Sequence, residues 1–246
     1  MKVKVYADYE TLSREAADEI IRCVRQKPNA VLCLAAGDTP KLTYETLTAR
    51  AIKESIDFSG CTFVGLDEWV GIPPDNEGSC SWFLHKYLFT PLSLPPSQIH
   101  LFNAMASDLE AECNKMNHTI RAANGIDLML VGIGMNGHIG FNEPGAPADS
   151  YAHVIDLDDT TRTVGQKYFK QQTSLSRGIT LGLKHLLEAR KVILIASGER
   201  KADIIRQTIL GPTTPDVPAT IVRSHANSIV MLDDAAGRYV KNLTKG

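Results

Sequence analysis

The residues of this chain best suited to acid–base chemistry lie in one glycine-rich loop. The apolar run 126–131 ends at Gly132 and Gly134, so a buried strand gives way to backbone that can approach a ligand closely. The loop carries an imidazole, a carboxylate and two amides within eight residues: Asn136, His138, Asn142 and Glu143. Imidazole changes charge near neutral pH and a carboxylate can fix its tautomer, so the His–Glu pair is a candidate general acid–base. The alternative is a structural turn whose polar side chains cap the next element.

A second strand ends in two adjacent carboxylates. The segment 63–72 is apolar and extended and carries Asp67 and Glu68. Neighbouring side chains on an extended backbone point to opposite faces. We therefore expect one of these carboxylates to enter a site and the other to point away from it.

A third strand leads into a helix that could bind an anion. The apolar segment 32–36 is followed by Gly37, Asp38, Thr39 and Pro40. Thr39 is a good N-cap and Pro40 suits the first helical position. Free N–H groups and the helix dipole at such a start attract phosphate, although many helices begin this way without binding anything.

The elements that must position these residues alternate along the chain. We expect strands near 2–6, 30–36, 61–66, 98–102, 126–132, 151–157, 190–196 and 227–232. Helical patterns lie at about 10–26, 40–54, 80–88, 107–123, 179–188, 198–210 and 234–242. This alternation predicts an α/β fold with a mostly parallel central sheet and helices on both faces. Without a repeat or a linker, we expect one domain over residues 1–246.

Composition restricts the kind of protein. The 246 residues have a formal net charge of −2, so no basic footprint indicates nucleic acid as a partner. No apolar run is long enough to span a bilayer, and the chain starts directly with an alternating strand, so we expect no membrane association. The five cysteines show no metal-ligand spacing, which favours reduced thiols in a cytoplasmic protein with no metal site.

Three motifs together resemble one enzyme family. Ala-Gly-Asp-Thr-Pro at 36–40, Leu-Asp-Glu-Trp-Val-Gly at 66–71 and Gly-His-Ile-Gly-Phe-Asn-Glu-Pro at 137–144 are similar, in order and spacing, to the isomerising glucosamine-6-phosphate deaminases. The resemblance runs from about residue 3 to residue 240. It implies a Rossmann-like fold and conversion of an amino-sugar 6-phosphate into a ketose 6-phosphate and ammonia, without a cofactor. Related 6-phosphogluconolactonases share the fold but continue differently after Gly-His.

The resemblance also assigns roles to residues. It implies that Asp67 moves a proton between sugar carbons and that His138, held by Asn136 and Glu143, opens the sugar ring. Matching positions for the substrate and its phosphate are found in the 36–39 turn and in two lysines: Ala36, Gly37, Asp38, Thr39, Lys167 and Lys201. Residues 157–178 are polar and weakly periodic, and we expect them to form a mobile lid.

Several positions depart from the family's usual residues. Asp38 stands where glycine is common, Lys167 where arginine is general, and Trp69 where tyrosine is frequent. These changes leave open whether the substrate is glucosamine or galactosamine 6-phosphate. A lactonase-like hydrolase and a non-catalytic sugar-phosphate-binding regulator also stay open, as does assembly as a monomer or a small homo-oligomer.

Some members of the family have a regulatory site, and this chain lacks the side chains that bind the effector there. Some longer members bind N-acetylglucosamine 6-phosphate through a serine and two basic residues. Here those positions hold Ala146, His153 and Ile155, which offer no fixed cation for a phosphate. We therefore expect a non-allosteric enzyme.

Overall fold

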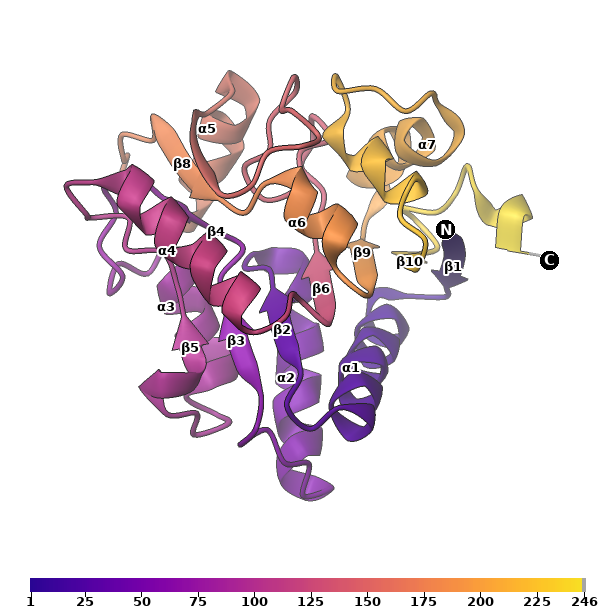
Figure 1. Ribbon diagram of the computed structural model, residues 1–246. Coiled ribbons are helices and arrows are strands. Elements are labelled where there is room, and N and C mark those ends of the chain that lie inside the picture. Colours follow the sequence, from indigo (N-terminus) through magenta and orange to yellow (C-terminus); the bar gives the residue numbers. More distant parts are fainter. Residues whose placement is uncertain (245–246) are drawn as a thin grey trace.

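Seven parallel strands form the central sheet of this computed structural model, which describes residues 1–244 (Figure 1). From edge to edge they are β1 (Lys2–Tyr6), β10 (Ser228–Asp233), β9 (Val192–Ala196), β6 (Leu128–Val131), β2 (Val31–Leu34), β3 (Thr62–Val64) and β5 (Ile99–His100). All neighbouring pairs are parallel. The predicted α/β fold with a parallel central sheet is confirmed.

Helices cover both faces of this sheet. They are α1 (Tyr9–Gln26), α2 (Asp38–Lys53), α3 (Cys80–Leu84), α4 (Leu109–Ala122), α5 (Asp159–Gly165), α6 (Leu183–Glu188) and α7 (Ala202–Leu210). Short 3-10 or π turns complete the set: η1 (His85–Phe89), η2 (Pro96–Gln98), η3 (Gln166–Tyr168), η4 (Glu199–Lys201), η5 (Pro218–Arg223) and η6 (Lys241–Thr244). One core lies between the sheet and α1, α2 and η1, and the other lies under α4, α6 and α7.

Period-two alternation in β2 explains why the sheet has a core on each side. Leu32 and Leu34 pack under α1 and α2, whereas Val31 and Cys33 face the opposite core. Successive side chains of a strand point to opposite faces, so a strand covered on both sides must be apolar throughout. Such strands read as unbroken apolar runs, which is how the sequence reveals them.

A second, smaller sheet was not predicted. It is antiparallel and contains β4 (Asp67–Trp69), β8 (Arg177–Thr180) and β7 (His153–Asp156) in that order. The expected strand at 151–157 is confirmed as β7, but it joins this sheet and not the main one. The short strands β4 and β8 form because distant segments pair with them, which local patterns do not record.

Three predicted elements need correction. The expected extended segment 63–72 is two strands. The main sheet holds the chain as far as the Gly65 N–H, which bonds to the His100 carbonyl, and the next residues pair with β8 in the second sheet as β4. The expected helix at 179–188 starts only at Leu183, since the preceding residues form β8. The expected helix at 234–242 is a run of turns followed by η6. Gly237 lies in that run, and glycine is a poor helix former.

The strand order creates a crevice between β2 and β6. After β2 the chain moves through β3 to β5 at one edge, and it then returns to β6 on the other side of β2. Connections therefore diverge where the carboxyl ends of β2 and β6 lie side by side, and open α/β sheets bind ligands at such a switch point. No helix among the described residues is long and apolar enough to cross a membrane.

Candidate active site

A pocket opens at the carboxyl ends of the strands, at the switch point. Its wall comes from the segments after β2, β3, β6 and β9 and from α3, α5 and η3, and its polar or charged lining residues include Asp38, Thr39, Asp67, Cys80, His138, Thr161, Lys167, Tyr168 and Lys201. The structure thus brings together every residue predicted for the site except two. Asn136 and Glu143 lie behind His138 and do not line the pocket.

His138 enters the pocket from the loop after β6, with one ring nitrogen held from behind. Its Nδ1 lies 3.3 Å from Glu143 Oε2 and 3.0 Å from Thr161 Oγ1. These partners occupy Nδ1 and leave Nε2 free to exchange a proton with a ligand. A Cβ on Gly134 would lie 2.5 Å from the ring, so the loop needs glycine at that position.

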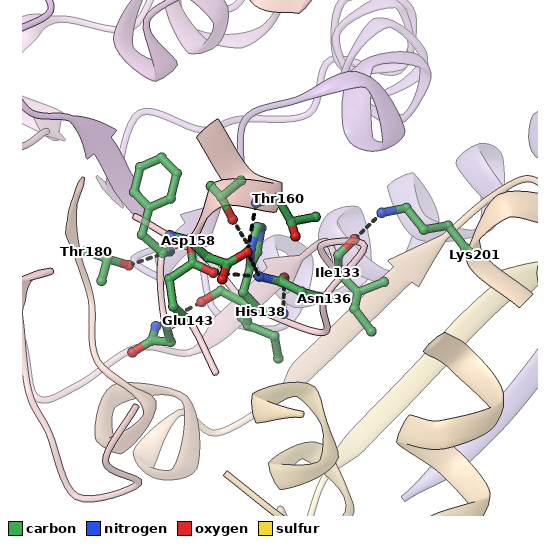
Figure 2. A network of polar contacts seen from close by, with 12 residues as sticks. Ile133, Asn136, His138, Glu143, Asp158, Thr160, Thr180 and Lys201 are labelled. Atoms are coloured by element: carbon green, nitrogen blue, oxygen red, sulfur yellow. Dashed lines mark hydrogen bonds and ion pairs between the residues drawn. The ribbon is translucent and has the colours of Figure 1, made fainter. Parts of the chain in front are cut away.

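Glu143 is buried and stays ionised because several groups donate to it. Figure 2 shows Asn136 Nδ2 donating to Glu143 Oε2 at 2.8 Å, while the backbone N–H of Asp158 donates to Oε1 at 3.3 Å. Burial alone would raise the pKa of Glu143, but hydrogen bonds from His138, Thr161 and Asn136 outweigh it and lower the pKa. A fixed carboxylate beside Nδ1 can stabilise the imidazolium form of His138.

Asn136 therefore acts on the imidazole indirectly. Its side-chain oxygen accepts the backbone N–H of His138 at 3.2 Å, and its amide contacts Glu143 rather than the ring. The expectation that Asn136 helps to hold the histidine agrees with this geometry, with Glu143 as the intermediary.

Asp67 opens β4 and points into the same pocket. Its surroundings raise its pKa to about 7, first because the carboxyl is buried and second because the Glu68 carboxylate lies next to it. A hydrogen bond from the Cys80 thiol, whose Sγ lies 3.6 Å from Asp67 Oδ1, lowers the pKa of Asp67 by a smaller amount. A carboxylate with a pKa near neutrality is a far stronger base than an exposed one, and it remains ionised at slightly alkaline pH.

Glu68 points away from the pocket, as alternation along an extended backbone predicts. Its two oxygens accept the backbone N–H groups of Trp69, Cys80 and Ser81 at 2.8–3.0 Å. The side chain is only 4% exposed. Glu68 therefore joins β4 to the start of α3 and has a structural role.

The start of α2 forms the corner of the pocket best suited to an anion. The helix begins at Asp38, and Gly37, with a φ of 115°, is its N-cap without a side-chain hydrogen bond. The expectation that Thr39 caps the helix is wrong, because Thr39 already lies in the first turn. That turn presents backbone N–H groups that no side chain caps, which suits a phosphate.

Two lysines face this corner. Lys201 Nζ donates to the Ile133 carbonyl at 2.5 Å, and burial, followed by the charges of Lys167 and Arg200, lowers its pKa to about 8. Lys167 on η3 forms an ion pair of 2.7 Å with Asp38, so two of the residues that depart from the family pattern contact each other. A bound dianion would relieve the repulsion between the lysines.

Thr161, Cys80 and Tyr168 are among the pocket residues that sequence reasoning missed. Thr161 reaches His138 from 23 positions away, Cys80 reaches Asp67 from 13 positions away, and Tyr168 lines the wall beside Lys167. No local pattern marks these contacts. Over residues 1–244 no cluster of three or more His, Cys, Asp or Glu side chains is arranged to hold a metal ion.

Comparison with known proteins places this geometry in a family. Residues 7–231 match the family model described as glucosamine-6-phosphate isomerases/6-phosphogluconolactonase. The chain belongs to this family. It is accordingly an enzyme, and the resemblance seen in its motifs is confirmed.

Individual relatives are similar to this protein along almost its whole chain. The glucosamine-6-phosphate deaminase of Lachnoclostridium phytofermentans is 42% identical over 232 residues, covering 94% of this chain and 98% of its own. That of Thermoanaerobacter pseudethanolicus is 38% identical over 241 residues, covering 98% and 95%. A solved structure of a monomeric glucosamine-6-phosphate deaminase is similar with a TM-score of 0.94 at 35% identity, covering 97% of this chain and 99% of that one. The Trypanosoma brucei 6-phosphogluconolactonase, at 19% identity and a TM-score of 0.76, shares the fold.

Proposed function

We propose that this enzyme isomerises and deaminates a hexosamine 6-phosphate to a ketose 6-phosphate and ammonia. The observation that carries the proposal is the presence in one pocket of a carboxyl group with a pKa near 7, a histidine fixed by a carboxylate, and a corner suited to an anion. These are the groups that ring opening, proton transfer at carbon and phosphate binding require.

His138 opens the sugar ring. With Nδ1 held by Glu143 and Thr161, Nε2 takes a proton from the anomeric hydroxyl and delivers it to the ring oxygen. The ionised Glu143 stabilises the imidazolium that exists between these two transfers. The product of this step is the open-chain aldehyde.

Proton transfer between carbons is the part of Asp67. Its carboxylate takes the proton from C2 of the aldehyde, and the same proton is then delivered to C1. One proton also passes from the C2 nitrogen to O1, so that the C1 aldehyde becomes an alcohol and the C2 amine becomes an imine. Water adds to C2 and ammonia leaves, which completes the ketose.

Phosphate binding falls to the start of α2 and to the two lysines. Lys201 lies beside the end of β6, and Lys167 reaches the first turn of α2 through Asp38. A 6-phosphate here would accept from the backbone N–H groups of that turn and pair with both cations. The Asp38 carboxylate must then move away from the phosphate or accept a sugar hydroxyl.

Residues 157–178 fit the part of a lid. They contribute Thr160, Thr161 and Lys167 to the pocket wall, and two surface ion pairs, Lys167–Asp38 and Lys170–Glu77, tether them. These exposed ion pairs contribute only about 0–1 kcal/mol each and oppose opening weakly, whereas the buried Leu157, Thr161 and Leu175 hold the rest of the segment in place. Closing it would exclude water while the sugar is open-chain.

The choice between glucosamine and galactosamine depends on positions that depart from the family pattern. Trp69 packs against Phe141 with ring centroids 4.5 Å apart, and a Cβ on Gly165 would lie 2.6 Å from the indole. Gly165 therefore makes room for a larger ring than tyrosine, at a wall of the sugar pocket. Trp69 and Asp38 both depart from the family pattern at the pocket. Both epimers, which differ in the direction of the C4 hydroxyl, should therefore be tested as substrates.

An ammonia-release assay tests the proposal. Purified enzyme is given glucosamine 6-phosphate, galactosamine 6-phosphate and, in parallel, 6-phosphogluconolactone. We expect ammonia and the matching ketose 6-phosphate from at least one hexosamine phosphate, with the monomer or a small homo-oligomer as the active species. Hydrolysis of the lactone alone would replace the proposal with a lactonase. Tight binding of a hexosamine phosphate without turnover would indicate a regulator.

The state of the cysteines supports a proposal for where the enzyme works. All five cysteines are free, and Cys33, Cys61 and Cys113 are buried in the cores. Unpaired thiols are usual where the medium is reducing. We therefore propose a cytoplasmic enzyme that acts on a small amino-sugar phosphate.

A further inference from the structure

Cys80 lies in the pocket wall next to the proposed base. It is the first residue of α3, and its Sγ lies 3.6 Å from Asp67 Oδ1. Within residues 1–244 this thiol is the one group that hydrogen-bonds to the Asp67 carboxylate. The orientation of the proposed base thus depends on a side chain to which the proton-transfer chemistry assigns no part.

The backbone fixes where this thiol lies. Glu68 accepts the Cys80 N–H at 3.0 Å and the Ser81 N–H at 2.8 Å, and Ser79 caps α3 by accepting the Trp82 N–H at 2.9 Å. Asp67 and Glu68 are neighbours in β4 with side chains on opposite faces. Glu68 therefore holds the backbone of Cys80, and the thiol lies near both carboxylates with its direct hydrogen bond to Asp67 Oδ1.

The chemistry of a thiol suits this place. Burial, together with the nearby Glu68 and Asp67 carboxylates, raises the pKa of Cys80 well above its usual range, so the group stays protonated and can donate. An S–H is a much weaker donor than an O–H. It can orient a carboxylate while taking away little of its basicity, because donors that favour the charged form lower a carboxyl pKa.

We propose that Cys80 is a positioning residue that holds the Asp67 carboxylate toward the reacting carbons and, as a weak donor, preserves its affinity for the C2 proton. This inference rests on the proposed function, in which Asp67 is the base. It assigns a role to the thiol as a hydrogen-bond donor and no covalent chemistry.

Two substitutions separate this role from simple packing. Cys80→Ser keeps the shape with a slightly shorter side chain and a stronger donor. The acid limb of the pH profile of kcat/KM should therefore move to lower pH by roughly 0.5–1 unit, as expected when a hydrogen bond to a charged group strengthens. Cys80→Ala removes the donor, so the limb should move to higher pH and kcat should fall while KM changes little. Cys23→Ser is the control, because Cys23 is a half-buried residue of α1 outside the pocket, and this substitution should leave the pH profile of kcat/KM unchanged.

A direct titration keeps this inference separate from the proposed function. The carboxyl pKa of Asp67 is measured by carbon-13 NMR in the wild type and in both Cys80 variants, using Asp67→Asn to assign the signal. We expect the pKa order Ala above wild type above Ser. An equal Asp67 pKa in all three proteins would overturn the role of Cys80, whatever the activity. Absence of ammonia release from either hexosamine phosphate, with the NMR order intact, would refute the proposed function and leave the thiol–carboxyl contact standing.

Discussion

Replacing Asp67 with asparagine should greatly slow catalysis and at the same time make the protein more stable. The carboxylate is held where its charged form is disfavoured, by burial and by the neighbouring Glu68 charge, so that its pKa is about 7 instead of the usual value near 3.8. An amide of the same shape does not carry that penalty. Because asparagine cannot accept the C2 proton, turnover should fall by roughly 10²–10⁴ with substrate binding largely kept.

The size of the stability gain follows from the pKa shift. Between about pH 4 and pH 7 the folded protein binds one proton more than the unfolded chain, so the free energy of unfolding decreases as pH rises through this window and levels off above it. A shift of about three pKa units at about 1.4 kcal/mol each gives a gain for Asp67→Asn of up to about 4 kcal/mol at pH 8. At pH 5 the gain should shrink to about 2 kcal/mol, because the folded wild type is by then protonated at Asp67.

Urea unfolding of the wild type and Asp67→Asn at pH 5 and pH 8 measures this difference. Asp75→Asn is the matched control, since Asp75 is exposed and has no hydrogen bond or ion pair within residues 1–244. The Asp75→Asn protein should therefore be as stable as the wild type at both pH values. An Asp67→Asn protein that is no more stable than the wild type at pH 8, or whose gain is the same at both pH values, would refute the reasoning that burial makes Asp67 basic.

Four further outcomes are expected from the rest of the site. Asp38→Gly should lower KM for the phosphorylated sugar by roughly 2–10-fold, since the Asp38 charge repels the bound phosphate by about 1 kcal/mol at this exposed corner. An increase in KM would mean that Asp38 contacts the sugar. Lys201→Met and Lys167→Met should raise KM for phosphorylated sugars and leave any weak activity on the free hexosamine unchanged, whereas Lys167→Arg should be tolerated. In the wild type, KM should rise above pH 8 as the Lys201 ammonium loses its proton. His138→Gln should slow turnover of the cyclic sugar far more than hydrogen exchange at C2 of an open-chain analogue, and equal damage to both would place His138 at carbon. Initial rates should be hyperbolic in substrate and indifferent to N-acetylglucosamine 6-phosphate, so sigmoidal kinetics that this compound abolishes would reveal another effector site.

Much of the main sheet could be predicted because its signals are local. The buried strands β2, β6, β9 and β10 are apolar runs, and the residues that leave them are glycines or polar groups. The parallel arrangement then puts the carboxyl ends of these strands at one edge. That rule alone predicts that His138, Asp67 and Lys201 meet, before any distance is known.

The second sheet could not be predicted in this way. The strands β4 and β8 are three and four residues long, and each is held by a partner more than a hundred positions away along the chain. The same limit applies to the bond between Thr161 and His138 and to the bond between Cys80 and Asp67. Such contacts depend on how separate elements pack, and a short segment carries no record of that packing.

The sequence by itself determined which chemical groups this protein offers and that they share one edge of a parallel sheet, because residue type and hydrophobic period are properties of neighbouring residues. Only the tertiary structure decided how those groups behave as acids, bases and charges. Burial beside Glu68 makes Asp67 a stronger base, Glu143 and Thr161 leave the Nε2 atom of His138 free to react, and Asp38 forms an ion pair with Lys167. Proton affinity and charge balance depend on distances through space and on exclusion of water, and both exist only once the chain has folded.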